Sequence, residues 1–541
     1  MRPGWRTPVA AACAVSLTLA GCSSEEEESG VKEDAFGYQV LSDLRTTNAG
    51  SLEGASDMSQ LLSGRLYPGV YVPGPSGQMI PNTDLVTTTV VPGDQRRVVY
   101  SLSDQAVFSD GTPVTCADYL LTFTAGQHPE VFGSSMPLFD DTAELSCTPG
   151  AKEFTLTFKE GRGARWRGLF EAGTVLPAHA VAAKLGKDTP TLIDDLRSDN
   201  LDQLRPIADV WRNGFSLGAF DPELQVSFGP FKIESVGEDG AVTLAANEYY
   251  YGDAPQMAEL VIWPGSADSA ELAEANALRI GDIRDPAPHW HDRDAEGNTL
   301  EITTVVGELT EMLTFPQAGV WAEPWNRQAL SRCIDPRAVA AVSSQAAGVE
   351  LPVAPLHVLQ HGDPLAQRVN DVAQPFLDVD IDAASALWGS TVRVGYAHPD
   401  PRMAAMVESM KKSCEPAGID IVDVTEGGKT LADLPHYDYD EWGNQVVTDG
   451  SVDAILRAAN PMREYPAANN RAQDLGMLRA QEKFLWQELP SIPLAAQPRT
   501  FVTDKAVRNV EPYTGLTGIG WNMDRWQLVP HTATETVKEQ R

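Results

Sequence analysis

The chain has 541 residues, 43% of them hydrophobic, and its 75 acidic residues outnumber its 41 basic ones to give a net charge of −34. This length is enough for three or four domains of about 150 residues, each able to bury a core. Such an anionic chain repels nucleic-acid phosphates, which argues against nucleic-acid binding. The charge fits either a well-solvated surface or a preference for amine-bearing ligands.

The N-terminal residues have the layout of an export signal. An apolar run from Val9 to Leu19 follows two arginines, and it is shorter than the roughly 20 residues that span a bilayer. Its end, Leu19-Ala20-Gly21-Cys22, resembles the lipobox of bacterial lipoproteins. We therefore expect a lipoprotein signal peptide at 1–21, a flexible charged tether at 22–33, and lipidation of Cys22 with diacylglycerol and palmitate. The protein would then sit on the extracytoplasmic face of the cell membrane.

Strand-like and helix-like segments are mixed along the whole chain, which predicts an α/β protein. A strand at 97–102 leads through a turn at 109–112 to a helix capped by Thr115 or Asp118. The later segments are, in chain order, an alternating strand at 153–159, a turn at 228–231 leading to a strand with its hairpin partner at 241–245, helices at 326–343 and 402–416, a strand at 419–424, a helix at 473–488 and an extended segment at 491–494.

The cysteines indicate disulfides. Of the six, Cys13 is removed with the signal and Cys22 is lipidated. The remaining ones are Cys116, Cys147, Cys333 and Cys414. An even number in an exported protein favours two bridges, and three pairings are formally possible. We favour 116–147 with 333–414, because each bridge then stays within one expected domain; buried free thiols are the alternative.

Five sequence blocks, taken in order, carry a resemblance. Most specific is Ala106–Asp118, with the sequence AVFSDGTPVTCAD. The other blocks are Phe228–Phe231, Asn247–Pro255, Asn326–Arg337 and Trp486–Leu494. Together they resemble motifs of the family 5 extracellular solute-binding proteins, which are the peptide- and nickel-binding components of ABC importers. Most of these residues are turn glycines and prolines, caps and core positions, so they point to a fold and leave the ligand open.

The resemblance implies an α/β, two-lobed periplasmic-binding-protein-like fold of type II (cluster C) with an extra inserted subdomain. We expect lobe I at 34–75, 215–290 and 496–541, the inserted subdomain at 76–214 and lobe II at 291–495. It further implies a monomer without cofactor or catalytic activity that captures an oligopeptide or similar small solute between its lobes. Its partners would be the subunits of an ABC permease, and the membrane through the lipid anchor.

Candidate ligand contacts also come from the resemblance. In peptide-binding relatives an aspartate a few residues after a tryptophan in lobe II holds the α-ammonium group. The corresponding stretch here is Tyr437–Asp449, where Asp449 lies seven positions after Trp442 while Asp440 precedes it. The candidate contacts are Trp442, Asp449, Tyr439, Asp440 and, from an aromatic floor, Trp388. The alternatives are a helix cap for Asp449 ahead of 451–457 and core packing for the tryptophans.

Three other functions have weaker support in the sequence. Gly214-Phe215-Ser216-Leu217-Gly218 matches the nucleophile elbow of hydrolases, but a helix-like segment precedes it where a strand is required. His289 and His291 flank a tryptophan and could indicate nickel or haem binding, although adjacent side chains point apart. The third is a non-transport accessory protein of the same fold that acts in lipoglycan or cell-wall assembly.

Overall fold

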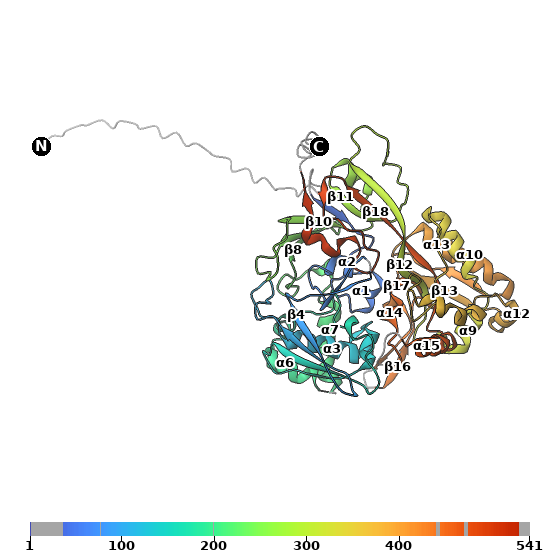
Figure 1. Cartoon of the computed structure of the whole chain (residues 1–541), viewed down its shortest axis with the longest axis horizontal. Coiled ribbons are helices and arrows are strands. Elements are labelled where there is room, and N and C mark those ends of the chain that lie inside the picture. Colours follow the sequence, from blue (N-terminus) through green and yellow to red (C-terminus); the bar gives the residue numbers. More distant parts are fainter. Residues whose placement is uncertain (2–35, 76, 199, 440–443, 470–473, 530–541) are drawn as a thin grey trace. The chain divides into compact units, whose positions relative to one another are not determined.

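The fold is organised around one large sheet to which most regions of the chain contribute (Figure 1). The structure is a computed structural model that describes Met1 and residues 36–529, except 76, 199, 440–443 and 470–473. The predicted signal peptide, the tether and Cys22 lie outside the described residues. Val31–Arg541 form one compact unit. Within the described residues, no helix is long and apolar enough to cross a bilayer.

Neighbouring strands within the large sheet run parallel in some pairs and antiparallel in others. Strands β13, β14 and β17 are parallel to one another, as are β1, β10 and β11, and the remaining pairs are antiparallel. In spatial order the strands are β14 (Asp420–Asp423), β13 (Thr391–Gly395), β17 (Ala454–Ala459), β12 (Leu300–Thr314), β18 (Ser491–Asp504), β11 (Leu278–Ile283), β1 (Gly37–Gln39), β10 (Glu259–Trp263), β9 (Val242–Ala246) and β8 (Phe231–Val236).

Strands β12 and β18 connect two different parts of this sheet. The 300–306 half of β12 pairs with 498–504 of β18, which in turn pairs with β11. The 310–314 half of β12 pairs with 491–496 of β18 and, on its other edge, with β17. Between the halves the register shifts from Val306 to Thr310, and a Cβ on Gly307 would lie 2.5 Å from the Gln497 carbonyl oxygen. The middle of this strand pair is therefore irregular and closely packed.

Among the described residues, the two largest hydrophobic cores are centred on different sides of that irregular point. One core runs from Phe36 to Trp526 and joins the β8–β11 part of the sheet with a second, four-stranded sheet. The other contains residues from Leu313 to Leu494 and packs around β13, β14 and β17. We call the part around the first core lobe I and the part around the second lobe II. The expected domain boundaries, including the inserted subdomain at 76–214, stay a proposal.

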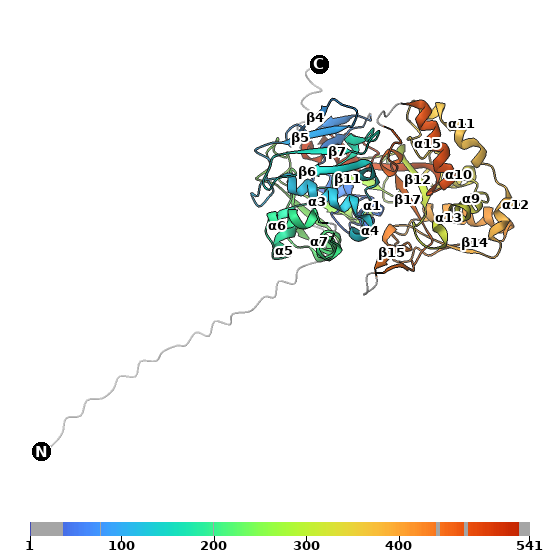
Figure 2. The ribbon, with the colours of Figure 1, turned by 90° about the horizontal axis from the view of Figure 1, so that it is seen from below.

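Lobe I carries the four-stranded sheet and its helices, seen together in Figure 2. That sheet has the order β4 (Val86–Val91), β5 (Arg97–Leu102), β7 (Glu153–Phe158) and β6 (Thr142–Ser146). Smaller pairs are β2 (Tyr71–Pro73) with β3 (Met79–Pro81) and β19 (Val507–Arg508) with β20 (Gln527–Leu528). The helices are α1 (Leu52–Ser56), α2 (Gln60–Ser63), α3 (Cys116–Gln127), α4 (Pro129–Phe132), α5 (Ala178–Lys184), α6 (Thr189–Leu196), α7 (Leu201–Asn213) and α8 (Ser269–Glu274).

Lobe II consists of its part of the large sheet and a helical shell, which lies together in both views (Figures 1 and 2). A hairpin of β15 (His436–Tyr439) and β16 (Gln445–Thr448) forms a two-stranded sheet of its own. The helices are α9 (Pro324–Ser331), α10 (Pro336–Ala347), α11 (Asn370–Ala373), α12 (Ile381–Ala384), α13 (Pro401–Cys414), α14 (Pro461–Glu464) and α15 (Leu475–Glu488).

The structure contains both favoured disulfides, Cys116–Cys147 in lobe I and Cys333–Cys414 in lobe II. It also confirms the cap of α3, where Thr115 and Asp118 form a capping box. The single helix expected at 326–343 is wrong, because two helices occupy it. The first ends at Ser331, and Asp335 caps the second ahead of Pro336. Proline lacks the N–H that a continuous helix would need there.

Candidate ligand-binding site between the lobes

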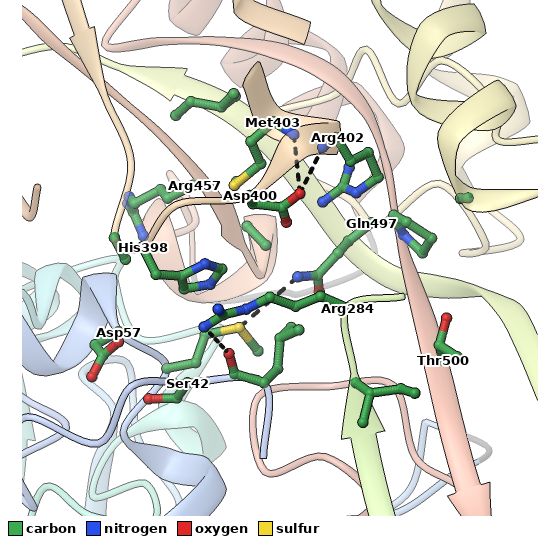
Figure 3. A pocket seen from close by; sticks show the side chains of 18 of the residues that line it. Ser42, Asp57, Arg284, His398, Asp400, Arg402, Met403, Arg457, Gln497 and Thr500 are labelled. Atoms are coloured by element: carbon green, nitrogen blue, oxygen red, sulfur yellow. Dashed lines mark hydrogen bonds between the residues drawn. The ribbon is translucent and has the colours of Figure 1, made fainter. Parts of the chain in front are cut away.

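Lobe I and lobe II meet along a seam that contains two cavities. Cavity 1 has a volume of about 50 Å³, which is room for about three or four water molecules. Its walls come from both lobes and from β18 (Figure 3). Among them are Ser42, Asp57, Met58 and Arg284 of lobe I, His398, Asp400, Arg402 and Arg457 of lobe II, and Gln497 and Thr500 of β18.

Cavity 2 lies next to cavity 1 along the same seam and has a volume of about 70 Å³. Met58, Arg457 and Ala458 line both cavities and separate them. The lobe I wall is mostly apolar, and the lobe II wall is charged. The residues that line cavity 2 include Met136, Leu138, Phe139, Phe170 and Glu171 of lobe I, and Arg463 and Glu464 of lobe II. A guest in either cavity would touch both lobes.

Arg457 is a charged residue in a strand whose six residues are all buried. Its guanidinium forms a two-pronged ion pair with Glu464, one contact of which is 3.2 Å, and donates to the Thr314 hydroxyl at 3.2 Å. Burial alone would lower the pKa of Arg457, but the attraction of Glu464 outweighs it and the pKa is raised. Glu464 ends α14, which begins at the side-chain cap of Asn460. The partner that β17 requires is therefore supplied a few residues further along the chain.

A second buried ion pair supports cavity 1 from lobe II. Arg402 donates to both carboxylate oxygens of Glu311 at 2.5 and 2.8 Å. Burial raises the pKa of Glu311 even though Arg402 opposes the shift. Arg402 is positioned by Asp400, which caps α13 and accepts from the Arg402 backbone N–H at 2.7 Å.

Two polar side chains that line cavity 1 have unused hydrogen-bonding capacity (Figure 3). The His398 Nδ1 and the Gln497 Oε1 are buried and have no hydrogen-bond partner in the described part of the chain. Burial, followed by the nearby positive charge of Arg284, lowers the pKa of His398 to about 4, so its ring is neutral at pH 7. An unpaired buried polar group costs about 1–3 kcal/mol. A polar guest that pairs with these atoms would recover that free energy.

The lobe I wall of cavity 1 supplies a carboxylate. Asp57 accepts from the backbone N–H groups of Asp43 and Arg45 at 3.4 and 3.1 Å. Burial nevertheless raises the pKa of Asp57 to about 6. Arg284 pairs with Asp43 at 2.7 Å and so stays within lobe I. The cavity thus offers groups of both signs together with neutral hydrogen-bonding groups.

The ligand contacts expected from sequence lie elsewhere. Asp440 and Trp442 fall outside the described residues. Tyr439 ends β15, where its backbone pairs with Gln445, and Asp449 follows β16 and is exposed. Asp449 lines neither cavity 1 nor cavity 2. The helix that Asp449 was to cap as the alternative is a strand, β17.

Trp388 is also outside both cavities. It follows the 3-10 helix at Ser385–Leu387, is 73% exposed, and lies against Gly418. Its role in binding, like that of Asp449, stays a prediction. The sequence did contain one signal for the residues that line the seam, and it was missed. This signal is Arg457, which interrupts the apolar run from Ala454 to Ala459. A charge in a fully buried strand requires a partner nearby.

Two other sequence motifs, the Gly214–Gly218 pentapeptide and the His289/His291 pair, lie in local structure that does not favour the chemistry they suggested. Gly214 is the C-cap of α7, so a helix and not a strand precedes Ser216, as the sequence indicated. His291 contacts the Leu300 carbonyl oxygen and the Asn298 amide in the loop before β12. Among the described residues, no three His, Cys, Asp or Glu side chains converge as metal ligands would.

The sequence profile of the bacterial extracellular solute-binding proteins, family 5 Middle, matches residues 81–460. The chain belongs to this family. It is 29% identical over 574 residues to an uncharacterized lipoprotein of Mycobacterium tuberculosis (strain ATCC 25618 / H37Rv), covering 97% of this chain and 98% of the relative. An uncharacterized lipoprotein of Mycobacterium leprae (strain TN) is 29% identical over 557 residues, covering 95% and 96%.

Solved structures of family 5 proteins share the fold. The oligopeptide-binding protein AppA from Bacillus subtilis, in complex with a nonapeptide, has a TM-score of 0.64 at 15% identity and covers 92% of this chain and 100% of its own. An oligopeptide-binding protein from Thermus thermophilus with a pentapeptide has a TM-score of 0.64 at 13% identity, covering 92% and 97%. NikZ from Campylobacter jejuni with Ni(L-His) has a TM-score of 0.60 at 14% identity, covering 92% and 100%. The two-lobed type II binding-protein fold is thereby established.

Proposed function

We propose that this protein is the lipid-anchored, extracytoplasmic solute-binding component of an ABC importer, which encloses a small solute between lobe I and lobe II and delivers it to a permease. The observation that carries the proposal is that both cavities draw their walls from the two lobes. A solute shifts a two-state equilibrium only through its different affinity for the two states. A guest on this seam contacts both lobes and therefore favours their closure.

The anchor is proposed to be the lipidated Cys22. Its support is the Leu19-Ala20-Gly21-Cys22 sequence together with the names of the mycobacterial relatives, which are lipoproteins that match over nearly their whole length. An acyl chain inserts into the bilayer with a favourable free energy of about 0.8 kcal/mol per buried CH₂ group. The folded body would stay beside the membrane, within reach of a permease.

We propose oligopeptides as the solute class to test first. The support comes from the fold relatives that hold a nonapeptide and a pentapeptide, and from the seam, which combines Asp57 with arginines and neutral polar groups. Sites for drug-sized ligands measure about 300–1,000 Å³, far more than the about 50 and 70 Å³ found here. The two cavities would therefore have to widen around a peptide.

A second candidate is the non-transport accessory protein of the cell envelope. The specific observation in its favour is that Asp449 is exposed and lines neither cavity, so the described part of the predicted peptide-anchor stretch leaves the seam without its expected carboxylate. This candidate differs from the first in its ligand. It would bind a lipoglycan or cell-wall precursor and would require no permease.

Thermal unfolding of the full chain separates the candidates. Di- to octapeptides, Ni²⁺ with histidine, and a glycolipid precursor would be added at equal concentration and the melting temperature recorded, because a ligand that binds only the folded state raises it. We expect a peptide to raise the melting temperature, and calorimetry to show saturable binding. A shift with the glycolipid alone would replace the first candidate by the second.

A further inference from the structure

Arg165 reaches from lobe I into lobe II. It lies in the loop between β7 and the 3-10 helix Trp166–Gly168, and it is only 8% exposed. Its guanidinium donates to three backbone carbonyl oxygens of lobe II, those of Val358 at 2.5 Å, Pro461 at 3.3 Å, and Tyr465. One Nη donates to Val358 and the other to Pro461 and Tyr465. These contacts require lobe I and lobe II to stand as close together as they do in this structure, which we call the closed arrangement.

Within the part of the chain that the structure describes, no ion pair accounts for the burial of Arg165. Among the described residues, its hydrogen-bond acceptors are these carbonyl oxygens, and the acids that act on it, Asp141, Glu482 and Asp363, do so without a direct bond. Burial, and then repulsion by Arg463, lowers its pKa to about 10, so the guanidinium keeps its charge at neutral pH. A buried charge needs its polar partners. Here lobe II provides them.

Two of the three carbonyl oxygens that accept from Arg165, those of Pro461 and Tyr465, belong to the segment around α14, which contributes to the lobe II wall of cavity 2. Pro461 begins α14 and Tyr465 caps its end, and between them lie Arg463 and Glu464, which line the cavity. The side chain of Arg463 crosses the seam to pair with Glu171 of lobe I at 3.1 Å. Any displacement of α14 would therefore move the charged wall of cavity 2.

A second arginine makes a similar contact beside cavity 1. Arg45 of lobe I donates to the carbonyl oxygens of Ala397 at 2.8 Å and Gly427 at 3.4 Å, both in lobe II. Ala397 lines cavity 1. Each cavity thus has next to it a lobe I arginine that binds main-chain oxygens of lobe II. Arg165 is the more buried of the two and makes the larger number of bonds.

We propose that Arg165 is the latch of this protein, a positioning residue that holds lobe I and lobe II in the closed arrangement and sets the place of α14 in the wall of cavity 2. The proposal rests on the proposed function, in which a solute is retained by lobe closure. The latch is part of the protein itself, so its effect on the lobes can be measured without any solute.

The experiment measures the distance between the lobes in the full chain. Spin labels on the exposed positions Glu238 in lobe I and Asp382 in lobe II would report a distance distribution by pulsed electron resonance. We expect Arg165→Ala to shift and broaden the distribution toward longer distances, with circular dichroism unchanged. Arg162→Ala is the matched control, because Arg162 lies in the same loop but its ion pair, to Asp141 at 3.9 Å, stays within lobe I. It should leave the distribution as in the wild type.

Folded Arg165→Ala protein with the wild-type distribution would overturn the proposal. If that variant failed to fold, Arg165→Lys would decide, because a single ammonium group cannot occupy the places of both Nη atoms; an unchanged distribution would overturn the latch and a longer one would support it. The proposed function is tested separately. If no solute bound, transport would fail while the latch could still hold, whereas solute binding with unaltered distances in the variants would reject the latch alone.

Discussion

Arg499 of β18 and Asp282 of β11 form an ion pair in which both side chains are completely buried. The Arg499 Nε donates to Asp282 at 3.1 Å, and the Nη1 donates to the carbonyl oxygens of Thr514 and Gly515 at 3.0 and 3.1 Å. The ion pair therefore links β18 to β11, and so to the lobe I part of the large sheet. Burial would lower the pKa of Arg499, but Asp282 outweighs it and the pKa is raised.

Removing one partner of this pair should strongly destabilise the protein. Arg499→Ala leaves the Asp282 carboxylate buried without its cation, and such a loss costs about 3–5 kcal/mol. Urea unfolding at pH 7 measures the difference. Arg337→Ala serves as control, because its partner Asp378 is 78% exposed, and exposed pairs contribute little. Equal effects of the two variants would show that the buried pair is dispensable.

The two disulfides should contribute unequally. They close segments with sequence separations of 31 and 81 residues. The chain-entropy estimate then gives about 3.7 kcal/mol for Cys116–Cys147 and about 4.5 kcal/mol for Cys333–Cys414. Double serine variants of each pair, unfolded in urea, should both lose stability, with the larger loss for the second. The reverse order would mean that native-state effects outweigh loop length.

His398 should make stability fall on acidification. Its pKa is lowered to about 4 in the folded state from about 6.5 when unfolded, so the unfolded chain binds the proton more tightly. The stabilising contribution is present above pH 6.5 and is lost as the pH falls toward 4. Between pH 7 and pH 5 the wild type should lose about 2 kcal/mol more than His398→Asn, measured by urea unfolding. Parallel pH profiles would contradict this.

Asp57 should have the opposite effect to His398 on how the stability of the protein changes with pH. Its pKa is raised to about 6 by burial, from about 3.9 when unfolded, so the folded protein binds the proton more tightly. Its contribution is present below pH 3.9 and is lost as the pH rises through 6. Relative to Asp57→Asn, the wild type should therefore gain stability when the pH falls from 7 to 4. Because Asp57 is present in both the wild type and His398→Asn, it cancels in that comparison.

The affinity for a solute that occupies cavity 1 should depend on Gln497. Its Oε1 is buried in the cavity without a partner among the described residues, so Gln497→Ala should weaken binding about tenfold, which corresponds to the roughly 1.4 kcal/mol of one lost hydrogen bond. Calorimetry with the peptide found by thermal unfolding would measure this. Asp449→Ala, which changes an exposed residue outside both cavities, should leave the affinity unchanged. If Asp449→Ala lost affinity and Gln497→Ala did not, the group that holds the α-ammonium of a peptide would lie beside the β15–β16 hairpin and not in cavity 1.

Local patterns in the sequence predicted several elements of the fold. The alternation at 153–159 became β7, and the hairpin at 241–245 became β9. The capping pair Thr115 and Asp118 began α3. These features depend on neighbouring residues only, and so they can be read without the fold. The break at Pro336 was equally local and could have been predicted.

The site itself depends on contacts that no local pattern contains. Cavity 1 brings Asp57, Arg284, His398 and Gln497 together from four distant regions of the chain. Their approach depends on how the two lobes sit, which is a property of the completed sheet. The resemblance identified the fold correctly but directed attention to Asp449, a residue of the exposed hairpin region. The arginine in the buried strand β17 would have been a better guide.

The pairing of β12 with β18 also governs when the protein can mature. Residues 300–314 of β12 bond to residues 491–504 of β18, and β11 of lobe I has β18 as its outer neighbour. A chain threading outward through an export channel, N-terminus first, cannot complete either lobe until this late segment has emerged. If the protein is exported as proposed, lobe I and lobe II are both completed only when this segment has emerged. A polypeptide stopped before residue 491 would leave two unpaired strand edges open to proteases and aggregation.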